Sequence, residues 1–315
     1  MGTVLKGELM LYTLTMNAAI DLNLTCLQVE SEKVNRVSDS DYSPNGKAIN
    51  VSIVLDHFGV ESVAMGVFGG FTGKHIVECL EVKGINVHPF YIDGATRINV
   101  FVSDDTEEYK FVSKGGHVSQ GVKDDILASI RGASDMEYLV VSGSLPPGVE
   151  PEYLDQIMSA CKENNVEVIF DISHDHLSSL LSKKPLLIKP NDEELMSMFG
   201  LRASNHAEAK DSLDTLHSLG AQNVLLTLGS NGMYFSNGDS IYFCNAPRIK
   251  LHSSACAGDS SLAAFLSVWL KDELNIQEAI QIASAVGADV ASSSGIGELS
   301  LYPQLVNMTF AKKIA

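Results

Sequence analysis

Short apolar runs alternate with longer amphipathic stretches along most of this chain. In 46–58, for example, Ile49, Ile53, Val54 and Leu55 form the apolar face of a predicted helix. Strands are predicted at 9–16, 62–67, 137–141, 166–170, 185–188 and 223–228, and further helices at 73–83, 151–164, 205–219, 259–271 and 276–292. Strand–helix alternation of this kind predicts an α/β fold with a mainly parallel sheet covered on both faces.

Two regions break this alternation. The stretch 22–44 is polar with β-prone patches, and 96–112 contains two predicted strands, 97–102 and 109–112, with no helix after them. Together they could form a small sheet outside the main one. Its functional interpretation is a lid over a binding site, and the alternative is an ordinary edge hairpin.

The charge of the chain limits its ligands. The 315 residues include 22 basic and 39 acidic side chains, a formal net charge of −17. We expect no nucleic-acid partner, because that affinity rests mainly on basic side chains that meet phosphates. A phosphorylated small molecule would also be repelled at long range, so binding one requires cations placed locally.

The five cysteines and the apolar runs bear on the compartment. The cysteines are odd in number and none is close to another in sequence, which favours reduced thiols in a cytoplasm. No apolar run approaches the ~18 residues of a membrane span. The N-terminus lacks the basic and then apolar pattern of a secretory signal. We therefore expect a cytoplasmic protein without membrane contact.

The segment 253–260 ends in small residues and an aspartate that open a helical pattern. Around Ala257 and Gly258, backbone N–H groups can approach a ligand closely, and a helix N-terminus adds partial positive charge. The segment therefore predicts an anion site. Beside it, Asp259 can accept the proton of an attacking hydroxyl while the N–H groups hold phosphoryl oxygens. On this segment alone Asp259 can equally be the N-cap of the helix.

Two more segments each have a chemical and a structural interpretation. In 189–194, Asn191 and Glu194 lie three apart at a predicted helix start and could hold the water shell of Mg²⁺, or they could form a capping box. In 227–232, glycines and an asparagine follow a strand. They could present amides to nucleotide phosphates, or form a β-hairpin turn at Asn231 and Gly232.

Seven segments, in their order along the chain, resemble the motifs of one family. They are 13–21 (TLTMNAAID), 45–51 (NGKAINV), 96–100 (TRINV), 142–148 (SGSLPPG), 189–194 (KPNDEE), 227–232 (TLGSNG) and 257–260 (AGDS). The chain is similar to the ribokinase/PfkB family of carbohydrate kinases, and within it to 1-phosphofructokinases and tagatose-6-phosphate kinases. Single motifs of this length are weak, but seven in the family's order favour the catalytic interpretation of Asp259 over the N-cap.

The resemblance implies a single ribokinase-like domain over 1–315. Its fold would be a three-layer α/β/α arrangement with a small β-sheet lid from segments near 22–44 and 96–117. The implied reaction is ATP-dependent phosphorylation of the free primary hydroxyl of a ketohexose monophosphate to the bisphosphate. The candidate substrates are tagatose 6-phosphate, fructose 6-phosphate and fructose 1-phosphate. A homodimer formed through the lid is also implied.

The same resemblance implies roles for individual residues. The general base would be Asp259, with Cys256, Ala257 and Gly258 around the transferred phosphoryl group. The sugar phosphate would contact Asp21, Gly46, Lys47, Asn50, Arg97 and Ser142. ATP would contact Lys189, Asn191, Thr227, Gly229, Ser230, Gly232 and Gly258, and also Ser284 and Gly287 at a helix start near 283–287. Mg²⁺ would be held through water by Asn191 and Glu194. In this arrangement Arg97 and Lys47 supply the local cations that the acidic chain requires.

The chain also departs from the family pattern. Cys256 stands in place of the first glycine of GAGD, and a cysteine adopts a positive φ only at a cost. Asn45 and Ala48 replace glycines of GGKG, and Ala18 replaces the proline of NPAID. In place of a GPG-like lid segment the chain has SKGGH at 113–117.

These departures leave two alternatives and one hypothesis. The protein could be a catalytically weak regulatory protein that binds nucleotide or sugar phosphate, or a kinase of an unphosphorylated sugar. Retention of Asp259, Asn191 and Glu194 argues against a pure binder, which needs no base. The lost glycine motivates the hypothesis that Lys47 or Lys189 completes the anion hole.

Overall fold

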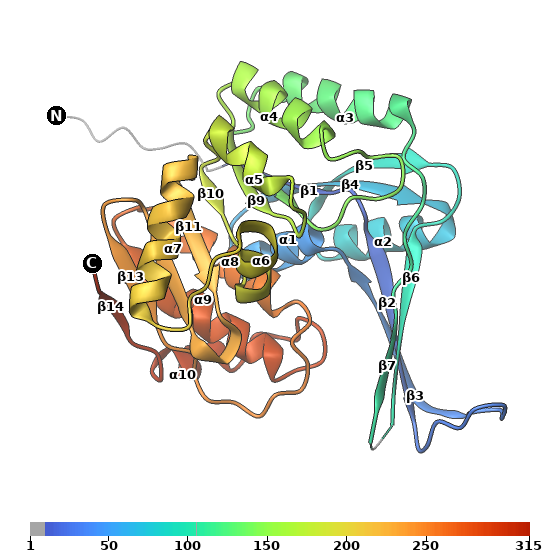
Figure 1. The fold of residues 1–315 in the computed structure, drawn as a ribbon. Helices are drawn as coiled ribbons and strands as arrows, with labels where there is room; N and C mark the ends of the chain where they lie inside the picture. Colours follow the sequence, from blue (N-terminus) through green and yellow to red (C-terminus); the bar gives the residue numbers. More distant parts are fainter. Residues whose placement is uncertain (1–9, 105) are drawn as a thin grey trace.

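Ten strands form the main sheet of the protein, described in a computed structural model that covers residues 10–104 and 106–315 (Figure 1). Their order is β14-β13-β12-β11-β10-β9-β8-β1-β4-β5. The strands from β11 to β5 are parallel, and β12, β13 and β14 continue the sheet antiparallel at one edge. Their bounds are β1 Leu11–Thr15, β4 Ser62–Gly69, β5 Asn86–Ile92, β8 Tyr138–Ser142, β9 Glu167–Asp171, β10 Leu187–Ile188, β11 Asn223–Thr227, β12 Met233–Ser236, β13 Ile241–Cys244 and β14 Ala311–Lys313.

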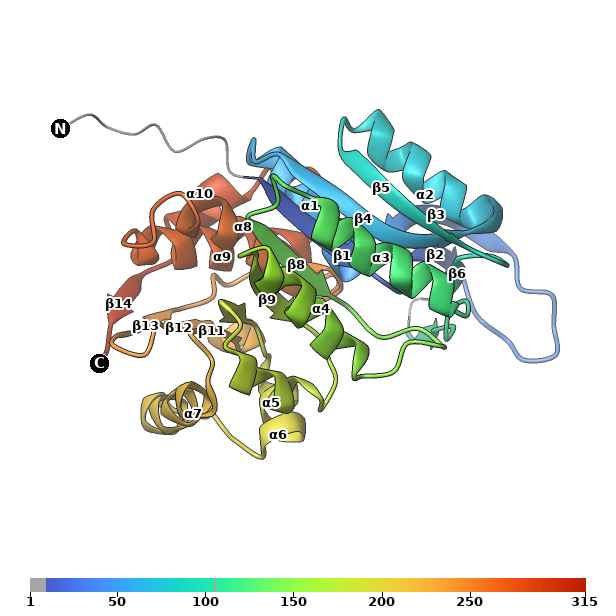
Figure 2. The same ribbon diagram turned by 90° about the horizontal axis from the view of Figure 1, so that it is seen from above.

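Helices cover both faces of the main sheet. One face packs against α3 (Gln120–Gly132), α4 (Tyr153–Glu163), α5 (Leu177–Leu180), α6 (Asp192–Phe199) and α7 (His206–Leu219). In Figure 2, α3 and α4 cross this face. The other face packs against α1 (Lys47–His57), α2 (Gly70–Val82), α8 (Ala257–Trp269) and α9 (Ile276–Ala291), with α10 (Tyr302–Val306) outside α9.

Burial on both faces explains why the central strands are continuous apolar runs. In β8, Leu139 packs into the core under α3 and α4, whereas its neighbour Val140 packs under α8 and α9. Successive side chains of a strand point to opposite faces, so every position of a doubly covered strand is buried. The predicted three-layer α/β/α fold with a mainly parallel sheet is confirmed.

A second, four-stranded sheet projects from the main body (Figure 1). We call it the small sheet; its strands are β2 (Ala19–Cys26), β3 (Val37–Asn45), β6 (Arg97–Ser103) and β7 (Glu108–Phe111), in the order β3-β2-β6-β7. The hairpin predicted in 96–112 is confirmed as β6 and β7. It does not extend an edge of the main sheet, because β6 pairs with β2 in this separate sheet.

Some predicted boundaries and connections differ. Leu9, in the first predicted strand, lies outside the described residues. The strand predicted at 185–188 is shorter, because β10 contains only Leu187 and Ile188. The helices α3, α5 and α10 and the strands β5, β13 and β14 were not predicted, whereas α6 begins at the helix start predicted in 189–194. Among the described residues, no helix has the length and apolar character needed to cross a membrane.

Candidate active site

A cavity of about 390 Å³ opens where the small sheet meets the main sheet. Its lining includes Thr15, Gly143, Ser173, Lys189 and Thr227, which lie at or just after the carboxyl ends of β1, β8, β9, β10 and β11. Open parallel sheets bind ligands at the carboxyl ends of their strands. The remaining lining residues are Asn17, Ala19, Asn45, Gly46, Lys47, Arg97, Asn99, Ser144, Asn191, Ser254, Cys256, Gly258 and Asp259.

Asp259 is buried in the first turn of α8 and lines this cavity. The helix begins at Ala257 and its N-cap is Cys256, so the interpretation of Asp259 as the N-cap is wrong. A carboxylate oxygen of Asp259 instead accepts a 2.8 Å hydrogen bond from the side-chain amide of Asn50 in α1. The backbone N–H groups of Ala257 and Gly258 belong to the same first turn, and such groups have no partner within their own helix.

The electrostatic surroundings of Asp259 make it a stronger base than an ordinary carboxylate. Burial raises its pKa to about 6, and the negative charge of Asp171 acts in the same direction. Lys47, the amide of Asn50 and Lys189 oppose the rise. A carboxylate with a pKa near 6 remains ionised at neutral pH and accepts a proton more readily than one with an ordinary pKa.

Asp171 links two lysines in the floor of the site. It is fully buried at the end of β9, 3.1 Å from the Nζ of Lys189 and 3.3 Å from the Nζ of Lys47. Burial opposes ionisation of Asp171, but the two ammonium groups outweigh it and lower its pKa. Lys189, only 4% exposed, is held by this ion pair close to the first turn of α8, with its Nζ 3.5 Å from where a Cβ on Gly258 would lie.

Sequence reasoning missed Asp171, although a signal for it exists. The residue directly follows the predicted strand 166–170, and polar residues at the carboxyl ends of buried parallel strands are positioned to face a ligand.

Glu194 and Asn191 form a capping box, which was one of the two interpretations of this segment. Asn191 accepts from the backbone N–H of Glu194 at 2.7 Å, and Glu194 accepts from the backbone N–H of Asn191 at 3.0 Å. The other carboxylate oxygen of Glu194 accepts from Ser173 and lies 3.7 Å from the Nζ of Lys47. Asn191 lines the cavity and Glu194 lies just behind it. Both oxygens of Glu194 thus have protein partners, and its part in holding Mg²⁺ remains a prediction.

Asp21 lies behind the cavity wall and is held by two asparagines that sequence reasoning did not assign. Its carboxylate accepts from the side-chain amide of Asn99 at 2.8 Å and from that of Asn45. Asn45 and Asn99 themselves line the cavity. Asn99 belongs to the motif TRINV, and Asn45 replaces a glycine of the motif GGKG. Both motifs were identified from the sequence, but neither asparagine was assigned a role.

Arg97 reaches the cavity from the small sheet. Its two terminal nitrogens donate to the backbone carbonyls of Ser113 and Asn17 at 2.9 and 3.0 Å. Its buried Nε has no hydrogen-bond partner among the described residues, and the same holds for the buried hydroxyl of Ser142. Burial lowers the pKa of Arg97, and nearby Asp21 partly offsets this effect. Buried polar groups are normally paired, so these two atoms are exceptions, and of the two residues Arg97 lines the cavity whereas Ser142 does not.

Gly46 permits a close approach at the start of α1. A Cβ at this position would lie 2.7 Å from the Cγ2 of Thr15, so a larger residue fits only if the side chain of Thr15 moves. The segment 113–117, which stands where a GPG-like motif was expected, packs against the same region: Asn17 donates to the carbonyl of Lys114 at 3.2 Å.

The loop 227–232 is both a hairpin connection and a neighbour of the site. β11 and β12 pair antiparallel across it, so the hairpin interpretation is confirmed. Thr227 lines the cavity and forms a parallel bridge with Asn191. Gly229 and Ser230 are exposed, whereas Gly232 is buried against the carbonyl of Cys244.

The expected helix start near 283–287 is wrong. The helix α9 begins at Ile276, so these residues lie in its interior. Ser284 is buried and donates to the carbonyl of Asn245 at 2.7 Å. A Cβ on Gly287 would lie 2.2 Å from the hydroxyl of Ser261 in α8, so this glycine permits close helix packing. Neither residue lines the cavity.

Cys256 adopts the left-handed conformation that its position requires, with φ of 62°. Its Sγ lies 3.3 Å from the amide nitrogen of Asn50. Burial raises the pKa of the thiol to about 12, and the carboxylates of Asp259 and Asp21 act in the same direction. The side chain is therefore neutral and sits beside the expected base.

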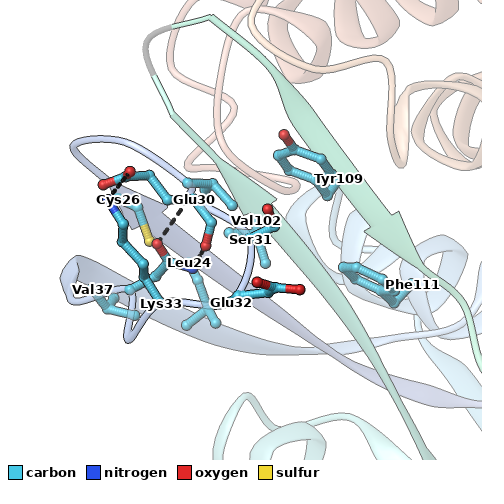
Figure 3. Close-up of a pocket in the computed structure, with 12 residues that line it drawn as sticks. Leu24, Cys26, Glu30, Ser31, Glu32, Lys33, Val37, Val102, Tyr109 and Phe111 are labelled. Carbon is cyan, nitrogen blue, oxygen red and sulfur yellow. Dashed lines mark hydrogen bonds and ion pairs between the residues drawn. The ribbon is translucent and has the colours of Figure 1, made fainter.

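A second hollow, of about 520 Å³, lies on the small sheet away from these residues (Figure 3). Its walls include Leu24, Val37, Val102, Tyr109 and Phe111, and the loop 29–35 borders it. The backbone N–H of Val29 ties that loop to Asp104 at 2.9 Å. None of the predicted site residues lines this hollow.

The cavity beside Asp259 has the groups that phosphoryl transfer needs. It is lined by a carboxylate of raised pKa, by the first turn of α8, by a buried lysine and by an arginine whose Nε has no hydrogen-bond partner among the described residues. Backbone amides and lysine suit the phosphates of ATP. Magnesium would meet Asn191 and Glu194 only through water, because both oxygens of Glu194 are engaged.

Comparison with known proteins agrees with this chemistry. The family model described as pfkB family carbohydrate kinase matches residues 7–302. The chain is 46% identical to the D-tagatose-1-phosphate kinase of Klebsiella oxytoca and 32% identical to the 1-phosphofructokinase of Bacillus subtilis, in each case over 94% of this chain and 97% of the relative. Its fold is similar to a tetrameric inhibited form of phosphofructokinase-2 from Escherichia coli, with a TM-score of 0.85, 26% identity, and coverage of 95% and 99%.

Proposed function

The chain belongs to the pfkB family of carbohydrate kinases, and on that premise we propose that it transfers the γ-phosphoryl group of ATP to the free primary hydroxyl of a ketohexose 1-phosphate. The observation that carries the proposal is the pairing of two features in one cavity. The buried carboxylate of Asp259 lies beside the first turn of α8, and Arg97 reaches the same cavity from the small sheet.

The position of the substrate phosphate is inferred from the relatives. The two kinases named above act, by their names, on sugars whose phosphate is on carbon 1. That leaves the hydroxyl on carbon 6 as the acceptor. Tagatose 1-phosphate is therefore our first candidate, although it was not among the sugars that the motifs suggested, and fructose 1-phosphate is the second.

Arg97 would bind the phosphate that the substrate already has. Its Nε is buried and lacks a partner among the described residues, and the hydroxyl of Ser142 is in the same situation. A charge-assisted bond to a phosphate oxygen would satisfy the guanidinium in a protein whose net charge repels anions. Hydroxyls of the sugar would meet the asparagines that hold Asp21, with Asn45 and Asn99 facing the cavity.

Asp259 would act as the general base. As the oxygen on carbon 6 attacks the γ-phosphorus, its proton passes to the carboxylate, the bond from phosphorus to the bridging oxygen breaks, and ADP leaves. The first-turn amides of α8 and the ammonium of Lys189 would stabilise the charge on the phosphoryl oxygens. Lys189 thereby completes the anion hole in which Cys256 replaces glycine.

The donor is ATP, placed between Lys189, Asn191 and Thr227 on one side and Gly258 on the other, since these residues line one cavity. When bound, Mg²⁺ neutralises phosphate charge. Water-mediated contacts to Asn191 and Glu194 would hold it, and chelation with excess EDTA should abolish turnover.

We also propose a homodimer formed through the small sheet, in the cytoplasm. On the small sheet Tyr42 and Phe111 are each 60% exposed and Val37 is 46% exposed, and the hollow of Figure 3 lies among such side chains. Exposed apolar patches of this kind mark protein interfaces. All five cysteines lie within the described residues and are unpaired, which supports a reducing compartment.

Sedimentation of two variants tests the dimer. Phe111→Asp should give monomers, whereas Phe310→Asp, which alters a similarly exposed aromatic residue (54%) outside the small sheet, should not. A monomeric parent protein would contradict this proposal.

ADP release over a panel of sugars tests the reaction. The panel is tagatose 1-phosphate, fructose 1-phosphate, tagatose 6-phosphate, fructose 6-phosphate and the two free sugars. We expect kcat/KM for the 1-phosphates to exceed the others by at least about tenfold, in line with one charge-assisted contact. Preference for a free sugar would overturn the substrate class. Ligand-induced stabilisation without any turnover would overturn the enzymatic role and favour a binding protein.

A further inference from the structure

We propose that Asn45 is a positioning residue that couples the sugar site around Asp21 to the base Asp259 through the side-chain amide of Asn50. The proposal rests on the proposed sugar site and on the proposed role of Asp259. It concerns a residue that stands where the resemblance leads one to expect glycine, which could make none of the side-chain contacts described next.

The amide of Asn45 is fixed in one orientation. Its oxygen accepts from the amide nitrogen of Asn50 at 2.9 Å and from the backbone N–H of Gly46 at 2.6 Å. Its nitrogen donates to Asp21. If the amide of Asn45 were flipped, its nitrogen would face the N–H groups of Asn50 and Gly46, and its oxygen would face the carboxylate of Asp21. The hydrogen-bond partners therefore allow only one orientation of this amide.

Asn50 is fixed in turn by its acceptors. Its amide nitrogen donates to Asp259 at 2.8 Å and to Asn45 at 2.9 Å, with the Sγ of Cys256 as a weaker third acceptor at 3.3 Å. Without the oxygen of Asn45, the amide nitrogen of Asn50 would keep only the carboxylate of Asp259 and the weakly accepting Sγ of Cys256, so the direction of its bond to Asp259 would be less fixed. A hydrogen-bond donor favours the ionised form of a carboxylate, and a less well aligned donor favours it less. Asn45 thus keeps the base ionised and aimed, although it does not touch it.

The location of Asn45 makes this coupling responsive to substrate. It is the last residue of β3 in the small sheet, and α1, which contains Asn50, begins two residues later. Asp21 belongs to the neighbouring strand β2, paired with β3. A sugar hydroxyl that binds Asn45, or Asn99 on the other side of Asp21, would therefore act on the same chain of hydrogen bonds that orients the base. Sugar binding and base alignment are linked in this way.

Steady-state kinetics of Asn45→Ala test the link, with Ser40→Ala as a matched control at an exposed position of the same strand. The other charged or titratable groups that face the base are unchanged in both variants: Lys47, Asp171, Lys189 and Cys256. For Asn45→Ala we expect a fall in kcat of about tenfold, the loss of roughly one buried hydrogen bond. The acid limb of its kcat/KM profile should move to higher pH by about half a unit.

A second variant keeps the test meaningful if Asn45→Ala folds poorly. Asn45→Asp retains an acceptor for Asn50 and Gly46 but places a second carboxylate against Asp21, so KM for the sugar phosphate should rise by at least about tenfold. In both variants KM for ATP should be unchanged, and circular dichroism with a melting curve reports folding.

The outcomes separate this inference from the proposed reaction. If Asn45→Ala matches the parent within twofold in kcat, with an unmoved acid limb, the coupling does not exist. A loss of kcat with an unmoved acid limb would also overturn it, because Asn45 would then be only structural. If instead Asp259→Asn keeps full activity, the proposed role of Asp259 as the base is overturned, whatever the result for Asn45→Ala.

Discussion

The side-chain amide of Asn50 and the carboxylate of Asp259 are joined by a 2.8 Å hydrogen bond between residues 209 positions apart. The bond ties α1 to the first turn of α8, which lines the cavity. Because Lys47 occupies the first turn of the same α1, one helix presents both a cation and the partner of the base to the site.

Replacing Asp259 by asparagine should abolish turnover. An amide of the same shape can still bond to Asn50 but cannot accept a proton from the sugar. General-base catalysis typically contributes 10²–10⁴-fold, so we expect kcat to fall by about a thousandfold. ADP release measures this, and thermal stabilisation by ATP should be retained. Residual activity above about a tenth of the parent's would contradict the assignment.

The same substitution should stabilise the folded protein at neutral pH. Burial raises the pKa of Asp259 to about 6, above the value of the unfolded chain, so the folded state prefers the protonated form. Ionisation therefore destabilises the fold progressively as the pH rises from about 4 to about 6, and fully above that window. Asp259→Asn should gain up to about 3 kcal/mol in the free energy of unfolding at pH 8. Urea unfolding at pH 8 and pH 4 checks this, and an equal gain at both pH values would contradict it.

Activity should fall on the acid side as the base becomes protonated. The acid limb of kcat/KM is expected near pH 6. Asp171→Asn removes the negative charge that raises the pKa of Asp259, so its acid limb should move to lower pH. The variant also leaves Lys47 and Lys189 without their shared carboxylate and should be less stable by about 3–5 kcal/mol. Because the variant is less stable, the pH profiles of kcat/KM should be measured at low temperature. A shift of the acid limb to higher pH would disprove the proposed electrostatic effect.

Removal of the Arg97 guanidinium should weaken sugar-phosphate binding selectively. Arg97→Met is expected to raise KM for the sugar phosphate by about 10–100-fold, the value of a charge-assisted hydrogen bond. KM for ATP should not change. Arg131→Met is the control, since Arg131 pairs with Glu163 on the surface, where such pairs contribute little. Equal effects on both substrates would indicate a general disturbance of the site.

The left-handed backbone of Cys256 should be measurable as strain. With φ of 62°, a residue with a Cβ is less stable than glycine by about 1–2 kcal/mol. Cys256→Gly relieves the strain and removes the thiol, whereas Cys256→Ala removes only the thiol. We expect the glycine variant to be the more stable of the two by about 1 kcal/mol. Any difference in kcat shared by both variants then reports the thiol beside Asn50, and a more stable alanine variant would argue against strain.

Much of the fold was predictable because burial imposes a regular pattern of apolar residues on the sequence. Strands covered on both faces, such as β8, appear as uninterrupted apolar runs, and the helices between them keep one apolar side. The short edge strands β12 to β14 lacked this pattern. Their pairing depends on antiparallel neighbours and not on a covering helix after each strand.

The candidate site was predictable only where motifs are contiguous. Asp259 and Arg97 lie in such segments, but Asp171 and Asn45 act through contacts between distant parts of the chain. Lys47 and Asp171, for example, are 124 positions apart. Gly287 shows the opposite error, because a glycine that lets two helices pack closely has the same sequence appearance as one that admits a ligand. Local patterns identify residue types, and only the fold brings their partners together.

The small sheet is assembled from two stretches of chain, one before α1 and one after β5, joined by parallel pairing of β2 with β6. To exchange substrate preference with a related kinase, the small sheet cannot be transferred as one continuous segment of sequence. Both stretches must be transplanted together, with Asp21 and Asn99 kept as a pair, because each half supplies one member of that contact. Natural divergence in sugar preference faces the same requirement, since a change in one hairpin must be matched by a change 78 residues downstream.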